Sequence, residues 1–211
     1  MDSADRRLAI RKAAVKLIYE KGYRGFTMRG LAQAVGIKGA SLYHHFPSKQ
    51  AMLTWILVGI QDELTTLVRL AVSDAGALPT LQLPAAIRAH LRYHVDHRHE
   101  ASISDSELRD LTPENRRRVV GLRDGYETIF RDIIRRGTEF NCWNAEPRLA
   151  GFIVMAMCTG VSTWYRADGP LSLEQIADYY TNFVVTALGG SGAGRRNRGG
   201  EGSVTILGAR S

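Results

Sequence analysis

The side chains with the clearest chemical use lie in one stretch near the start of the 211-residue chain. This stretch runs from Thr27 to Lys49 and reads TMRGLAQAVGIKGASLYHHFPSK. Apolar residues recur at helical spacing before Gly36 and again after it, which predicts two short helices joined by a tight turn. The second helix would expose short or polar side chains and fit a DNA major groove, which is about 12 Å wide. Its side chains would reach base edges while Tyr43 and Lys49 hold phosphates, so we expect duplex DNA as a partner.

Charge is distributed unevenly along the chain. Residues 1–49 hold ten Lys or Arg and three Asp or Glu, whereas residues 50–211 hold eighteen of each, so the formal net charge of +7 lies at the N-terminal end. Localised positive charge beside such a pair of helices is typical of a duplex binder, because neutralising phosphates releases counterions. The alternative is a solvated basic face without a partner.

The run Ser41-Leu42-Tyr43-His44-His45-Phe46-Pro47-Ser48-Lys49, preceded by Thr27 and Gly36, closely resembles the DNA-binding domain of the TetR family. The resemblance implies an all-α protein with a three-helix helix-turn-helix domain over residues 1–49 and a ligand-binding and dimerisation domain over residues 50–188. It also implies a homodimeric repressor that binds a palindromic operator, responds to a small-molecule effector, and uses no cofactor. The candidate DNA contacts are Thr27, Arg29, Lys38, Gly39, Ser41, Tyr43, His44 and Lys49.

The start of the second helix departs from the family pattern. Many members have Ser followed by Lys-Gly before this helix, whereas this chain has Lys38, Gly39 and Ala40. The usual hydroxyl that caps the helix is therefore missing, and Lys38 becomes a candidate phosphate contact instead.

Apolar periodicity and helix-capping residues predict about nine helices. Thr112-Pro113 and the pair Ser172 and Gln175 are strong start signals. Besides the pair flanking Gly36, we expect helices over residues 3–21, 48–73, 85–99, 105–111, 113–136, 147–165 and 172–188. We expect Gly22 and Gly137 to end two of them, residues 74–84 to form a linker, and the glycine-rich tail over residues 189–211 to be disordered.

The sequence favours a cytoplasmic protein without a membrane segment. Acidic and basic residues interrupt the N-terminus, so no secretory signal is expected. Cys142 and Cys158 form neither a disulfide framework nor a metal-binding pattern. The uncharged stretch over residues 149–165 is short for a membrane span and contains polar residues, so a buried interface helix explains it better.

An effector cavity is expected in the second domain, because several aromatic and polar residues fall on its helices. Core packing explains each of them equally well, but together they favour a roomy, apolar pocket. The candidates are His90, His94, Arg109, Arg123, Tyr126, Phe130, Trp143, Met155, Trp164 and Tyr165.

The same region looks like a TetR subgroup that responds to acyl-CoA thioesters in fatty-acid or sterol breakdown. The resemblance lies in Glu107-Leu108-Arg109, in residues 123–137, and in Trp164-Tyr165 with the segment that follows. It implies an acyl chain in the aromatic cavity, with arginines such as Arg109 or Arg123 binding CoA phosphates.

The last two helices are predicted to form a dimer interface. Small residues four apart permit close helix approach, and the final helix has a wide apolar face. Ordinary internal core is the alternative. The candidate interface residues are Ala156, Gly160, Ile176, Tyr180, Phe183, Val184 and Ala187.

Two rival classes remain open. His90, His94 and His97, with Glu100 nearby, recur at helical intervals and could form a metal site in a sensor or an enzyme. No nucleophile elbow, phosphate loop or dinucleotide motif supports catalysis, and we expect no metal. A nonspecific architectural DNA binder is the other rival, which the discrete second helix and the large apolar domain argue against.

Overall fold

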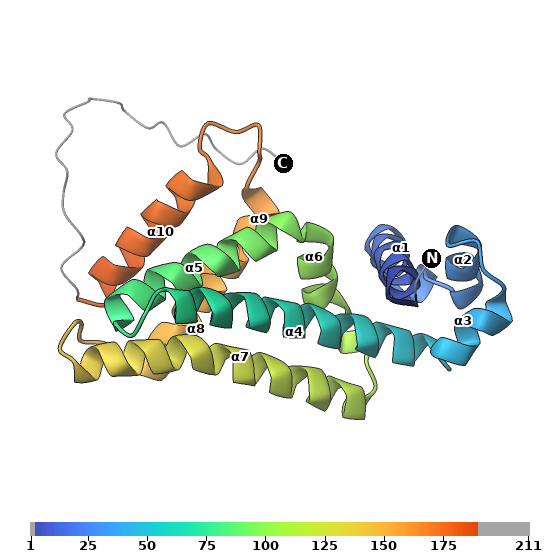
Figure 1. The fold of residues 1–211 in the computed structure, drawn as a ribbon, viewed down its shortest axis with the longest axis horizontal. Helices are drawn as coiled ribbons and strands as arrows, with labels where there is room; N and C mark the ends of the chain where they lie inside the picture. The colour runs from blue at the N-terminus through green and yellow to red at the C-terminus, as the bar shows by residue number, and fades with distance from the viewer. Residues whose placement is uncertain (1–2, 190–211) are drawn as a thin grey trace.

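A computed structural model describes residues 3–189, which form ten α-helices and one 3-10 helix (Figure 1). The expected all-α fold is confirmed. The predicted disordered tail, apart from Gly189, lies outside the described residues. The elements are α1 (Ser3–Gly25), α2 (Met28–Ala34), α3 (Gly39–His45), α4 (Lys49–Asp74), α5 (Pro79–Asp96), α6 (Arg98–Ser106), η1 (Glu107–Asp110), α7 (Pro113–Glu139), α8 (Pro147–Thr159), α9 (Val161–Trp164) and α10 (Leu173–Ala187).

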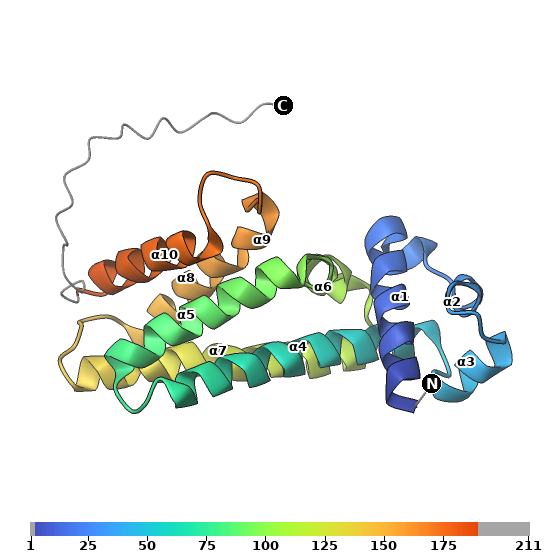
Figure 2. The ribbon, with the colours of Figure 1, turned by 45° about the horizontal axis from the view of Figure 1, so that its top comes forward.

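The first three helices form a small bundle at one end of the molecule, and α1 lies between α6 and the pair α2 and α3 (Figure 2). Their shared core includes Ile18, Phe26, Leu31 and Leu42, each at most 1% exposed. The predicted end of the first helix is correct in part: Gly22 leaves helical geometry with φ 67°, but a further turn continues to Gly25.

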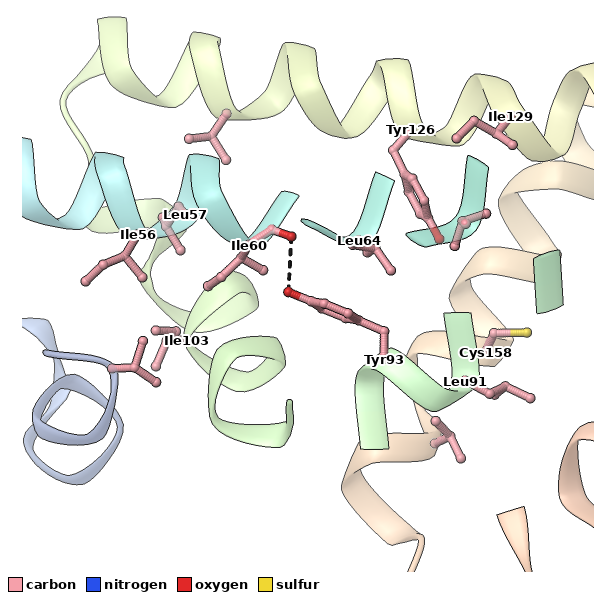
Figure 3. Packing of buried hydrophobic residues seen from close by; sticks show 14 of the residues in the cluster. Ile56, Leu57, Ile60, Leu64, Leu91, Tyr93, Ile103, Tyr126, Ile129 and Cys158 are labelled. Carbon is pink, nitrogen blue, oxygen red and sulfur yellow. Dashed lines mark hydrogen bonds between the residues drawn. The ribbon is translucent and has the colours of Figure 1, made fainter. Parts of the chain in front are cut away.

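Helix α4 leads away from this small bundle into a larger one, where it packs against α5 and α7 (Figure 1). Ile60 and Leu64 of α4 lie near Tyr93 of α5, and Leu64 also lies near Tyr126 of α7 (Figure 3). The Tyr93 hydroxyl donates a hydrogen bond to the Ile60 carbonyl at 3.2 Å. Among the described residues, α4 has the length and hydropathy of a membrane span. Half of its most apolar stretch is buried, as in the core helix of a folded bundle.

The predicted linker over residues 74–84 is wrong, because α5 already begins at Pro79. Proline suits the first turn of a helix, where its missing N–H needs no partner. The helix continues through Pro84, because Gln82 and Leu83 become buried when this segment is helical. The connection from α4 is a short turn at Gly76, which has φ 83°.

Gly137 does not end α7, which continues to Glu139. A Cβ atom at residue 137 would lie 2.0 Å from the Trp143 ring, so the glycine makes room for that indole. The Trp143 Nε1 donates to the Ile134 carbonyl at 2.7 Å. The chain instead reverses at Asn141, which has φ 57°.

Two other boundaries also differ from expectation. The expected helix over residues 147–165 is divided at Gly160 into α8 and α9, and the segment expected at residues 105–111 is the end of α6 followed by η1. Both strong start signals are confirmed. Thr112 caps α7, and Ser172 and Gln175 form a reciprocal capping box at the start of α10.

Candidate nucleic-acid interface and buried cavity

Helix α3 presents a polar face at the end of the molecule (Figure 1). Lys38, Gly39, Tyr43 and His44 are exposed, whereas Leu42 is fully buried and anchors the helix. Gly36 adopts φ 69° in the turn before α3, a conformation that favours glycine. Lys38 occupies the cap position without a side-chain hydrogen bond, in line with the missing hydroxyl noted in the sequence.

Some predicted DNA contacts also have structural roles. Thr27 is exposed, and its hydroxyl accepts from the Gly30 N–H at 3.1 Å to cap α2. Arg29 is exposed on the same helix. The Lys49 ammonium donates to the Arg24 carbonyl at 3.2 Å and lies 4.3 Å from the Tyr23 ring centre, which directs it toward the end of α1.

A hydrogen-bonded junction connects this bundle to η1. The Tyr23 N–H donates to a carboxylate oxygen of buried Glu107, and Gln50 at the start of α4 donates to the Asp110 carbonyl at 2.6 Å. The Gln50 side-chain oxygen accepts from the Thr112 N–H at 3.0 Å. Sequence reasoning missed this junction: it noted Glu107 and Thr112 for other reasons, and the contacts join residues far apart in the chain.

A cavity of about 110 Å³ lies among helices α4 to α8. Five of the predicted ligand residues line it: His90, His94, Arg123, Tyr126 and Met155. The sequence did not single out the remaining lining residues, which are Ile60, Gln61, Leu64, Tyr93, Ala101, Ser104, Asp105 and Thr159. Ile60, Leu64, Tyr93 and Tyr126 are visible in Figure 3. The cavity is therefore smaller than the roomy pocket expected from the sequence, and a few buried polar atoms interrupt its mainly apolar wall.

His90 is held on both sides by hydrogen bonds. Its Nδ1 lies 2.7 Å from the Tyr126 hydroxyl, and its Nε2 lies 3.3 Å from the Thr159 hydroxyl. Burial lowers the pKa of His90 well below its usual value, and neighbouring His94 lowers the pKa further. A neutral ring with one donor and one acceptor nitrogen matches two hydroxyl partners.

His94 stacks on His90 with ring centres 4.3 Å apart, but its Nδ1 has no hydrogen-bond partner among residues 3–189. Burial lowers the pKa of His94 to about 4, with a smaller contribution from the positive charge of Arg123. The Nε2 of Gln61 is likewise buried without a partner in the described part of the chain. Both side chains are more than nine-tenths buried and line the cavity.

The charges at the cavity wall compensate each other. Arg123 donates to the Ser104 hydroxyl at 2.9 Å and lies 3.4 Å from the Asp105 carboxylate. Burial raises the pKa of Asp105, while Arg123 opposes that rise.

The other predicted ligand residues lie elsewhere. Phe130 is buried behind the cavity, with its ring centre 6.0 Å from that of His90. Trp143 packs on Gly137, and Trp164 is exposed. The Arg109 side chain is exposed on η1, and Tyr165 lies under the Arg98 guanidinium. The structure therefore does not bring these side chains into the predicted pocket, because their helices present them to other neighbours.

A surface groove of about 850 Å³ adjoins the cavity and shares Ala101, Asp105 and Thr159 with it. Its remaining lining combines a mainly apolar surface with several hydroxyl groups and consists of Tyr19, Arg98, Ser102, Ser106, Ala156, Gly160, Ser162 and Thr163. The Arg98 guanidinium donates to the Tyr165 carbonyl at 2.6 Å, which holds the positive charge beside the groove.

The outer faces of α8 and α10 expose several large apolar side chains. They are Leu149, Phe152, Ile153, Tyr179 and Phe183, each more than half exposed. Of the predicted interface residues, Ala156, Phe183 and Ala187 are exposed, while Gly160 and Tyr180 are half-buried. Ile176 and Val184 are buried within the protomer, which corrects their assignment to an exposed face.

The three histidines of the rival metal site do not converge on one point. His97 stacks on Tyr93 and lies 3.8 Å from Glu100, whereas His90 is held by Tyr126 and Thr159. Within residues 3–189, no group of three or more His, Cys, Asp or Glu side chains is arranged to hold a metal ion.

Two family models match the chain. The model for bacterial regulatory proteins of the tetR family matches residues 10–54, and the model for the tetracyclin repressor-like C-terminal domain matches residues 76–188. The chain is 29% identical to the transcriptional repressor KstR2 of Mycobacterium tuberculosis over 188 residues, covering 87% of this chain and 92% of that protein.

Solved structures share the fold. The TetR family regulator PfmR of Thermus thermophilus is 34% identical, with a TM-score of 0.76, and the match covers 86% of this chain and 97% of that one. AibR in complex with isovaleryl coenzyme A and operator DNA is 27% identical, with a TM-score of 0.77 and coverage of 84% and 97%. The chain therefore belongs to the TetR family of DNA-binding transcriptional regulators and is not an enzyme.

Proposed function

We propose that this regulator is a homodimeric repressor that binds a palindromic operator and releases it when an acyl-CoA thioester binds the second domain. We expect it in the cytoplasm, because its proposed partner is chromosomal DNA. The proposed units are residues 1–49 for operator binding and residues 50–188 for effector binding and dimerisation.

The exposed polar face of α3 supports operator recognition. His44 and half-buried Ser41 are assigned to base edges, whereas Lys38 and Tyr43 are assigned to phosphates. Thr27, Arg29 and Gly39 are also exposed in the same small bundle. Lys49 stays a candidate phosphate contact, although its ammonium also holds the end of α1 through the Arg24 carbonyl.

The apolar face of α8 and α10 supports dimerisation. Exposed Phe152, Ile153 and Phe183 would be covered when two copies pair through these helices into a four-helix bundle. A two-fold dimer would then present its two α3 helices to half-sites about 34 to 36 Å apart.

The observation that carries the effector proposal is the small cavity beside a much larger groove lined by Arg98 and several hydroxyl groups. An acyl group would occupy the cavity, and the groove beside Arg98 offers hydroxyl donors to the nucleotide part of CoA. The relative AibR binds isovaleryl coenzyme A, which supports this ligand class for the present chain. The relative KstR2 is a ketosteroid transcriptional regulator, which supports lipid or sterol breakdown as the proposed context for the present chain.

Effector binding would act on operator affinity through α6 and η1. Ser104 and Asp105 line the cavity, and Glu107 two residues later holds the Tyr23 N–H of α1. A shift of α6 would therefore move α1 and, with it, α3. Weakening operator binding about 100-fold requires a coupling free energy of about 2.7 kcal/mol, and operator must weaken effector binding equally.

The test begins with selection of bound duplexes from a random DNA library at fixed moderate salt. An enriched inverted repeat supports the dimeric repressor, whereas binding without enrichment would favour an architectural role. The recovered operator is then titrated with short-chain, long-chain and steroid-derived CoA thioesters. If none of them changes operator affinity or melting temperature, the acyl-CoA assignment is wrong.

A further inference from the structure

We infer that the cavity selects a short acyl group that carries a neutral oxygen, such as a hydroxyl or keto group, and that Gln61 and His94 recognise this oxygen. This inference rests on the proposed acyl-CoA function and deepens it by specifying the acyl group.

The volume limits the length of the group. An engineered apolar cavity of roughly 150 Å³ in another protein accepts benzene, so a cavity of about 110 Å³ accommodates about four or five non-hydrogen atoms. Drug-sized ligands and steroid nuclei need roughly 300 Å³ or more. An oxygenated acyl group of about four carbons fits this limit with its thioester carbonyl at the cavity mouth, because three carbons and one oxygen then lie inside.

The unpartnered polar atoms of Gln61 and His94 indicate which chemical group the ligand must carry. Gln61 and His94 line the cavity, and Gln61 Nε2 and His94 Nδ1 are buried without partners in the described part of the chain, while His90 already has Tyr126 and Thr159. A buried polar group that lacks a partner costs roughly 1 to 3 kcal/mol, and a ligand oxygen would remove that cost. Gln61 can donate to this oxygen, and neutral His94 can donate to a keto group or accept from a hydroxyl.

The charges at the wall favour a neutral ligand group. Arg123 is the cation that lines the cavity, and it is engaged by Ser104 and by the Asp105 carboxylate. A carboxylate or phosphate in the cavity would face Asp105 without a cation of its own. The anionic part of the ligand belongs instead in the groove outside.

The experiment measures affinities of the full chain by calorimetry for matched thioesters: butyryl, 3-hydroxybutyryl, acetoacetyl and decanoyl, each on N-acetylcysteamine and on CoA. We expect the 3-hydroxybutyryl or acetoacetyl thioester to bind about tenfold or more tighter than the butyryl thioester. Gln61→Leu and His94→Leu should each reduce this preference. Met155→Leu changes an apolar cavity residue and should retain it.

The outcomes distinguish failure of this inference from failure of the proposed function. Equal affinity for butyryl and 3-hydroxybutyryl groups, tighter binding of decanoyl, or an unchanged preference in both variants would overturn the inference. CoA thioesters that bind no tighter than their N-acetylcysteamine counterparts would overturn the acyl-CoA function, while an oxygen preference among the latter would still support the inference. Absence of binding by every thioester would overturn both. Since the preference is measured first in the unaltered protein, the inference stays testable even if a variant fails to fold.

Discussion

The carboxylate of Glu107 accepts a hydrogen bond from the Tyr23 backbone N–H at 3.3 Å, across 84 residues of sequence. This contact joins the segment after the cavity to the kinked end of α1. It thus links Asp105 at the cavity wall, two residues before Glu107, to the small bundle that carries α3.

Replacing Glu107 tests whether this contact transmits effector binding. Glu107→Ala should reduce the coupling free energy between effector and operator by about 0.5 to 2 kcal/mol, because the Tyr23 N–H loses its acceptor. Titrations of effector with and without operator measure the coupling. Glu107→Gln keeps an acceptor oxygen and serves as the control. Coupling that is equal in Glu107→Ala and the unaltered protein would exclude this route.

Gly137 and Gly125 of α7 provide a matched pair of substitutions that tests the stability of the protein. Gly137→Ala should destabilise the protein by about 2 kcal/mol or more, because the new Cβ would overlap the Trp143 ring. Gly125→Ala on the same helix has no neighbour within 4 Å of its Cβ and should raise stability by up to about 1 kcal/mol. Urea unfolding of both variants measures the difference. Similar stabilities would contradict the packing role assigned to Gly137.

The exposed apolar face of α8 and α10 predicts that charged substitutions there prevent dimerisation. Phe152→Glu and Phe183→Glu should give monomers with unchanged helical content, since both side chains are more than half exposed within a protomer. Light scattering and circular dichroism provide the two readouts. Leu70→Glu on α4 is also more than half exposed but lies outside this face, so it should remain dimeric. Dimers in both phenylalanine variants would place the interface elsewhere.

The buried histidines make stability depend on pH. The pKa of His94 is about 4 in the folded protein, below an unfolded value near 6.5, so the unfolded chain binds more protons between these pH values. Stability contributed by neutral His94 is therefore present above pH 6.5 and lost as pH falls toward 4. The loss between pH 7 and pH 5 is about 2 kcal/mol, and His90 acts in the same direction.

Urea unfolding at pH 7 and pH 5 measures this dependence. His94→Gln removes the titrating group and should lose less stability between the two pH values than the unaltered protein does. His45→Gln, at an exposed position on α3, should match the unaltered protein. An equal loss in all three proteins would argue against a neutral buried His94.

Substitutions of exposed residues in and next to α3 should distinguish residues that set DNA affinity from residues that set sequence preference. Lys38→Ala and Tyr43→Ala should weaken binding to all duplexes, and Lys38→Ala should reduce the slope of log affinity against log salt by about one. His44→Ala should instead change which bases are preferred. Binding across several salt concentrations and a repeated duplex selection provide the measurements. An unchanged salt slope in Lys38→Ala would remove its phosphate assignment.

Local sequence patterns determined much of this protein. Gly36, Leu42 and the run ending at Lys49 identify the helix-turn-helix, because a tight turn and a buried anchor depend on residues close together in the chain. Thr112 and the pair Ser172 and Gln175 marked helix starts correctly for the same reason. Charge counting located the basic end without any structure.

Tertiary packing decided the rest. Burial of Gln82 and Leu83 made a helix of the expected linker, and Trp143, expected in the pocket, instead fills the space above Gly137. Helical spacing suggested His90 and His94, but the facing residues Gln61, Ser104 and Thr159 come from three other helices. The sequence by itself therefore determined the fold class and the DNA-binding motif, which depend on local periodicity and turn chemistry. Only the tertiary structure determined the cavity's small size, its polar atoms and its link to Tyr23, since these depend on contacts between residues far apart in the chain.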